Sequence, residues 1–117
     1  MEARELPATF DRLRQILEPH LSATTVVTDE PGSLYLQTGP AGKPEMFAAV
    51  AVKTSSVAFH YMPVYRHPDL LDGIPADLRK RLKGKSCFHF RRADDPAIDD
   101  LRRLVETTAD EALSGSD

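Results

Sequence analysis

The sequence has one cysteine, no long apolar run and no opening segment of the secretory type. A single cysteine excludes an internal disulfide, which is typical of proteins from a reducing compartment. The longest apolar run, residues 46–52, is far shorter than the ~20 residues of a membrane-spanning helix. The first residues, MEARELP, carry charges of both signs and do not match a secretory signal. These absences predict a cytoplasmic protein without a membrane segment.

Acidic residues are absent from one segment, residues 79–92. This segment carries seven cationic side chains, whereas the whole chain has a formal net charge of −3, so the remainder is strongly acidic. A local anionic partner is therefore compatible with the sequence, while the acidic remainder makes nucleic acid an unlikely partner. A predicted basic helix and the turn after it offer a candidate anion site, and the alternative is a solvated helix end. The candidate residues are Arg79, Lys80 and Lys83 of the helix and Lys85 after Gly84.

The composition is that of an ordinary globular domain, with 41% apolar and 28% charged residues in 117 residues. This length suits one core rather than two. We therefore expect a single α+β domain over residues 1–113 and a frayed tail at residues 114–117. Nothing in the sequence predicts a cofactor.

Hydrophobic periodicity predicts three helices. The first buries Phe10, Leu13, Ile16 and Leu17, with Pro7 in its first turn, and ends before Pro19. The second is short and basic, and it begins at Pro75 and ends before Gly84. The last is capped by Asp95 and buries the apolar stripe Ile98, Leu101, Leu104 and Val105.

Five strands are expected, at residues 24–28, 33–38, 46–52, 56–62 and 86–90. The element order α-β-β-β-β-α-β-α, with short turns between the first four strands, predicts an antiparallel sheet with helices on one face. Strand 46–52 is almost wholly apolar and is expected at the centre of the sheet, covered on both faces. Strand 24–28 is a candidate edge strand, so a monomer and a homodimer both remain open.

Strand parity separates two faces in strands 56–62 and 86–90, because successive side chains point to opposite sides. The aromatic side chains are expected in the core, given the area that each ring buries: Val57, Phe59, Tyr61, Phe88 and Phe90. His60, Cys87 and His89 then share the other face and come within reach of one another if the two strands are neighbours. The ligand-site candidates are these three and residues of the following loop: His60, Met62, Tyr65, His67, Cys87 and His89.

Two imidazoles and a thiol are also ligands that suit Zn or Cu(I). A metal carrier would use His60, His67, Cys87 and His89, although their spacing matches no metal signature. Catalysis by a cysteine–histidine pair lacks an evident orienting carboxylate. Loop 62–73 either lines a ligand cleft or buries Leu70 and Leu71 under the last helix. Gly42-Lys43 resembles a phosphate loop only superficially, because Pro44 replaces the hydroxyl residue.

The stretches AVAVKTSSVAFHYMPVY and HPDLLDGIPADLRKRLKGKSCFHF resemble the YdhG-like domain-of-unknown-function family. These are small bacterial cytosolic α+β proteins, and one branch has been described as frataxin-like iron chaperones. The resemblance spans most of the chain and implies an antiparallel sheet with helices against it. It carries over no iron ligand, because the first helix mixes Asp11 and Glu18 with three arginines.

The leading hypothesis is a non-enzymatic cytosolic accessory domain that binds an unknown small molecule or protein partner. Its site would lie around the open sheet face and the loop that follows. The first alternative is a metal carrier for iron or zinc. The second is a small enzyme acting on an anionic metabolite, which would need a pocket containing a base of perturbed pKa.

Overall fold

A computed structural model describes residues 2–38 and 45–113. The elements are, in chain order, α1 (Glu2–Leu17), the 3-10 turn η1 (Glu18–Ala23), β1 (Thr25–Glu30), β2 (Ser33–Thr38), β3 (Glu45–Val52), β4 (Val57–Tyr61), α2 (Met62–Arg66), the 3-10 turn η2 (Pro68–Leu71), α3 (Ala76–Arg81), β5 (Leu82–Lys83), β6 (Cys87–Phe90) and α4 (Ala97–Leu113). The predicted loop with Gly42-Lys43 and the predicted frayed tail lie outside the described residues.

The strands form one antiparallel sheet of six strands in the order β1-β2-β3-β4-β6-β5. The predicted α+β class is confirmed, and the strand count exceeds the prediction by the two-residue strand β5. β1 forms one edge, where the side chains of Val26 and Val27 are 42% and 53% exposed. The turn into β2 places Gly32 at a φ of 85°, a conformation that glycine adopts without a steric cost.

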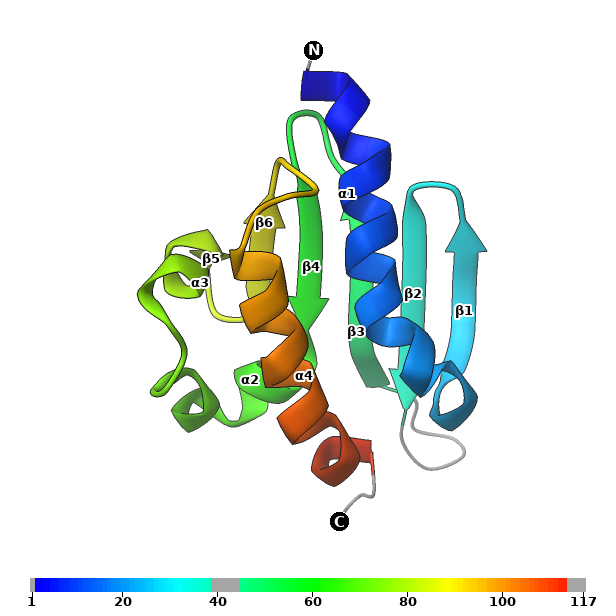
Figure 1. Ribbon diagram of the computed structural model, residues 1–117. Helices are drawn as coiled ribbons and strands as arrows, with labels where there is room; N and C mark the ends of the chain where they lie inside the picture. The colour runs from blue at the N-terminus through cyan, green and yellow to red at the C-terminus, as the bar shows by residue number, and fades with distance from the viewer. Residues whose placement is uncertain (1, 39–44, 114–117) are drawn as a thin grey trace.

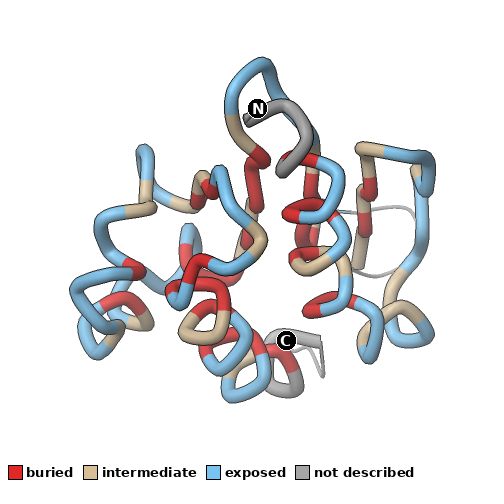
Figure 2. The backbone as a smooth tube through the Cα atoms, turned by 45° about the horizontal axis from the view of Figure 1, so that its top comes forward, coloured by how far each residue is buried: buried red, intermediate tan, exposed pale blue. Residues whose placement is uncertain are grey.

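The long helices α1 and α4 lie on the same face of the sheet (Figure 1). Buried positions gather on the central strands and on the helix stretches that face them (Figure 2). The predicted core residues of β4 and β6 are all buried, as are the predicted apolar stripes of α1 and α4. Tyr61 connects the two layers, because its hydroxyl lies 2.6 Å from Oγ1 of Thr108 on α4. Among the described residues, no long helix lies on the opposite face of the sheet.

Strand β3 was expected to be covered on both faces. This prediction is wrong, because helices cover only one face of the strand. β3 lies inside the sheet between β2 and β4, but α1 and α4 cover one side only. On the other side its residues are small. Ala49 is only 8% exposed there, flanked across the strands by Tyr35 and His60. Neighbouring strand residues thus shield this small side chain, which no helix of the described part of the chain covers.

Three predictions about local structure are corrected. Pro7 lies inside α1, because the helix begins earlier, at Glu2. The segment after β4 forms α2, since Pro63 occupies the first turn, where its missing N–H needs no helical partner. The basic helix ends at Arg81, and Gly84, with a φ of 73°, turns the chain from β5 into β6.

Loop 62–73 supports the packing alternative more than the cleft alternative. Leu71 is 9% exposed, and Leu70 is partly buried against the core. Tyr65 and His67 are exposed. No helix in the described part of the chain is both long enough and apolar enough to cross a membrane.

Candidate functional site

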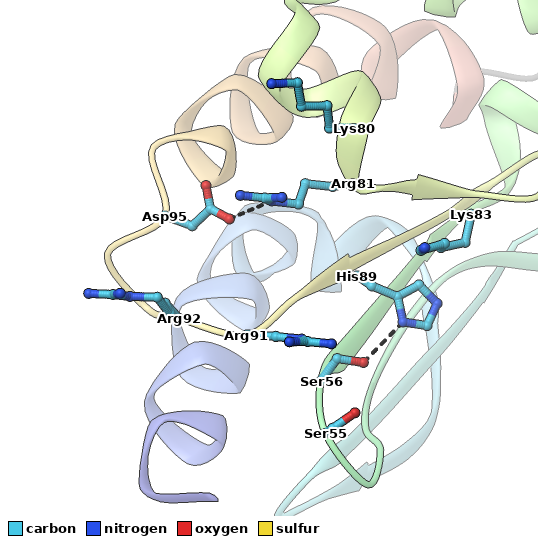
Figure 3. A pocket seen from close by; sticks show the side chains of 9 residues that line it. All are labelled: Ser55, Ser56, Lys80, Arg81, Lys83, His89, Arg91, Arg92 and Asp95. Carbon is cyan, nitrogen blue, oxygen red and sulfur yellow. Dashed lines mark hydrogen bonds and ion pairs between the residues drawn. The ribbon is translucent and has the colours of Figure 1, made fainter. Parts of the chain in front are cut away.

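A cavity of about 590 Å³ opens at the end of the sheet where β6 finishes and β4 begins. We call it the cationic pocket (Figure 3). Pockets that hold small ligands typically measure ~300–1,000 Å³, so its size suits a metabolite. Its lining residues are Ser55, Ser56, Lys80, Arg81, Lys83, His89, Arg91, Arg92 and Asp95.

The antiparallel pairing of β4 with β6 brings the two sides of the pocket together. Val57, the first residue of β4, pairs with Phe90, the last residue of β6. Ser56, just before β4, and Arg91, just after β6, therefore lie at the same end of the two strands. The α3–β5 segment forms another wall, because α3 ends at Arg81 and β5 places Lys83 beside Cys87 of β6. Residues far apart in the sequence therefore meet at one rim of the sheet.

Five cationic side chains and one carboxylate line the cationic pocket. The carboxylate, Asp95, is buried and lies 2.7 Å from Nε of Arg81, and its other oxygen accepts the backbone N–H of Ala97 at 2.9 Å. Asp95 therefore caps α4, as predicted, and neutralises one arginine. Arg92, which lines the pocket, forms an ion pair with Asp94, which does not line it.

Three cations of the lining have no carboxylate partner within 4.0 Å among the described residues: Lys80, Lys83 and Arg91. All three are exposed, so water hydrates their charges in the absence of a ligand. Figure 3 shows Lys83 and Arg91 on the side of His89, across from the paired side chains of Arg81 and Asp95. The pocket therefore carries excess positive charge, which favours anions over neutral or cationic molecules.

Beside the cationic pocket, four side chains form a hydrogen-bonded row on the open sheet face. Sγ of Cys87 lies 3.5 Å from Nε2 of His60 and 3.3 Å from Nε2 of His89. Nδ1 of His89 in turn lies 3.0 Å from Oγ of Ser56. Because Ser56 and His89 also line the pocket, the row connects the pocket with the thiol.

The row can hold its protons in two directions, because hydroxyl, thiol and neutral imidazole each donate and accept. In the first, Ser56 donates to His89, His89 donates to Cys87, and the thiol donates to His60. In the second, every donor and acceptor in the row is reversed, and the hydroxyl proton of Ser56 is free to turn into the pocket. Both directions give each of the four side chains a hydrogen-bond partner within the row. A ligand that bonds to Ser56 can therefore select one direction over the other.

Burial and nearby positive charge keep the row neutral. Desolvation lowers the pKa of both His60 and His89, and Lys53 lowers both further. Lys83 acts in the same direction on the pKa of His89. Desolvation raises the pKa of Cys87, which Lys53 partly opposes. At neutral pH the row therefore consists of a protonated thiol and uncharged imidazoles.

The structure brings together some of the predicted site residues. His60, Cys87 and His89 meet as strand parity predicted, and Lys80 and Lys83 line the cationic pocket. The pocket lining does not include the remaining candidates: Met62, Tyr65, His67, Arg79 and Lys85. Nζ of Lys85 lies 5.9 Å from the ring centroid of Tyr65, and a guanidinium nitrogen of Arg79 donates to the carbonyl of Leu71.

The predicted site residues did not include six that line the pocket: Ser55, Ser56, Arg81, Arg91, Arg92 and Asp95. The signal that could have found the pocket is the acid-free segment, since Arg81, Arg91 and Arg92 belong to it and line the cavity. A serine in a turn carries no comparable signal, because its role depends on the distant β6.

No group of three or more His, Cys, Asp and Glu side chains within residues 2–38 and 45–113 is arranged to hold a metal ion. No family model, no curated protein and no solved structure matches the chain. The resemblance to the YdhG-like family therefore stays a prediction.

Proposed function

We propose that this protein is a non-enzymatic cytoplasmic accessory domain that binds a small anionic ligand in the cationic pocket. The ligand class is a metabolite that carries phosphate or carboxylate groups. The observation that carries the proposal is the imbalance of charge in one cavity, where Lys80, Lys83 and Arg91 have no ion-pair partner among the described residues.

The construction of the pocket supports this proposal. Asp95 holds Arg81 in place through a 2.7 Å ion pair, and Asp95 itself is fixed by capping α4. One cation is therefore rigid, while the exposed lysines can adjust to the shape of the ligand. Ser56 and His89 add hydrogen-bonding groups at the same wall. Such a mixture of fixed and adaptable groups suits a charged molecule with several oxygen atoms.

The test is calorimetric titration with inorganic phosphate, sulfate and citrate. Lys83 and Lys85 offer a matched pair, because both are exposed and flank Gly84, but only Lys83 lines the pocket. Lys83→Gln should weaken binding several-fold, whereas Lys85→Gln should leave it near the wild-type value at equal ionic strength. Equal losses in the two variants would show general charge attraction and would contradict a site.

A second candidate, an enzyme acting on an anionic metabolite, is favoured by one observation. His89 lines the pocket with a lowered pKa, so it can accept a proton at neutral pH. Incubation with a panel of phosphate esters, followed by phosphorus spectroscopy, tests this candidate. Conversion that disappears in His89→Gln would support catalysis, and binding without conversion would support the accessory domain.

A further inference from the structure

We propose that an anion in the cationic pocket converts Cys87 from a resting thiol into a reactive thiolate, and that His89 transmits this change. The inference rests on the proposed function, because it requires that the pocket take up an anion. It makes Cys87 a modification site whose reactivity depends on the ligand. The geometry behind it is the row that runs from Ser56 in the pocket through His89 to Cys87.

The resting state is unreactive for a physical reason. The thiol is half-buried, and the charged groups that act on the row are the cations Lys53 and Lys83. The other titratable neighbour is His60, whose imidazole is uncharged at neutral pH. These surroundings disfavour a proton on His89, so no imidazolium stands beside the thiol. A cysteine of this kind reacts slowly, because the thiolate is the nucleophile.

An anion in the pocket selects one direction of the row. The hydroxyl of Ser56 donates to the anion, so its oxygen must accept the Nδ1 proton of His89. Nε2 of His89 is then the acceptor for the thiol proton at 3.3 Å. The anion's charge also offsets the repulsion from Lys83, which favours the imidazolium form of His89.

One proton then moves from Sγ of Cys87 to Nε2 of His89, which yields an imidazolium and a thiolate. His60 donates its own Nε2 proton to the thiolate from the other side, at 3.5 Å. With a small disulfide, the thiolate sulfur attacks one reagent sulfur, and a protein–reagent S–S bond forms as the reagent's S–S bond breaks. Cys87 is oxidised, the departing thiolate is reduced, and that thiolate takes the proton from His89.

The assay uses dipyridyl disulfide, a neutral reagent that has no charge to direct it to the pocket. Cys87 is the only cysteine in the chain, so the released pyridinethione reports on this residue alone. If bound sulfate raises the thiolate fraction about tenfold, the weaker nucleophilicity of the more acidic thiol removes a factor of about three. Saturating sulfate should therefore raise the rate about threefold near neutral pH at constant ionic strength.

Three variants separate the steps. His89→Gln should bind sulfate but lose the rate increase, because the relay is gone. His60→Gln tests the other end of the row, since His60 contacts the same sulfur but does not line the pocket. This variant should change the resting rate, because the hydrogen bond to the thiolate changes, but sulfate should still raise the rate. Ser56→Ala should reduce the response and serves as the second test if His89→Gln fails to fold.

The pH profile gives an independent readout. Sulfate should move the midpoint of the rate profile to lower pH in wild type and leave it unmoved in His89→Gln. If calorimetry detects sulfate binding but the wild-type rate and midpoint do not change, this inference is overturned and the anion site stands. If sulfate does not bind, the proposed function fails and this inference fails with it.

Discussion

Nε of Arg81 lies 2.7 Å from Oδ2 of Asp95, and this ion pair joins the end of α3 to the start of α4 inside the cationic pocket. The side chain of Asp95 is only 8% exposed, while that of Arg81 is 41% exposed. Asp95 has two roles, because it caps α4 through the N–H of Ala97 and reduces the positive charge of the pocket. These roles can be separated by substitution.

Asp95→Asn should keep the cap, because asparagine caps helices about as well as aspartate, and should lose the charge. We expect a stability loss of about 1 kcal/mol and tighter sulfate binding. Asp95→Ala should lose about 2 kcal/mol of stability, because the cap is also gone. It should bind sulfate less tightly than Asp95→Asn, because no side-chain oxygen then holds Arg81 in place. Denaturant unfolding and calorimetry measure the two effects. Asp100→Asn is the control, since Asp100 pairs with Arg103 outside the pocket. Unchanged sulfate affinity in both Asp95 variants would refute the charge argument.

The turn between β5 and β6 depends on Gly84. Its φ of 73° is a left-handed conformation, and a Cβ placed there would meet nothing within 4 Å. Gly84→Ala should therefore cost about 1–2 kcal/mol through backbone strain alone. Gly73→Ala is the matched control, because Gly73 has the same open space without a positive φ, and it should be neutral or slightly stabilising. Equal effects in thermal unfolding would refute the assignment of strain.

Tyr61 makes the folded protein less stable at alkaline pH. Burial raises its pKa from 10.0 to about 12, while the bond to Thr108 lowers it slightly. The folded protein therefore keeps this proton at a pH where the unfolded chain has lost it, so stability falls as pH rises above 10.0. Tyr61→Phe should cost about 1 kcal/mol at neutral pH. The wild-type advantage in urea unfolding should shrink by about 1 kcal/mol near pH 11, and a constant difference would contradict this account.

His89 should make the affinity for anions increase at acidic pH. Its pKa is lowered from 6.5 in the free domain, and a bound anion favours its charged form. Binding is then linked to proton uptake, so sulfate affinity should rise as pH falls below 6.5. Sulfate keeps its double negative charge over this range, so a change in affinity with pH must come from titration of the protein. Calorimetry of wild type and His89→Gln at two pH values measures it. A wild-type affinity that stays constant would remove His89 from the site.

The fold and part of the site followed from short-range patterns. Strand parity needs only a period of two, and it correctly placed His60, Cys87 and His89 opposite the aromatic core. Apolar spacing likewise located the buried stripes of α1 and α4. These features depend on neighbours in the sequence, which is why they could be predicted.

The cationic pocket could not be predicted in the same way. Ser56 and His89 are 33 residues apart, and they meet only because β4 pairs with β6 in one register. Gly84 was expected to end a helix, but its left-handed conformation serves the turn after β5, a strand too short to show alternation. Residues 62–73 were expected to form a loop, but Pro63 fits the first turn of α2, because proline needs no N–H partner there.

The most direct test of the central claim is a sulfate titration followed in the amide proton–nitrogen spectrum of the wild-type protein. We predict saturable shifts concentrated at the lining residues of the cationic pocket, with Ser56, His89 and Arg91 among the largest. The amides of β1, at the opposite edge of the sheet, should not move. Shifts that grow linearly without saturation, or that spread equally over the basic surface, would contradict an anion site in this pocket.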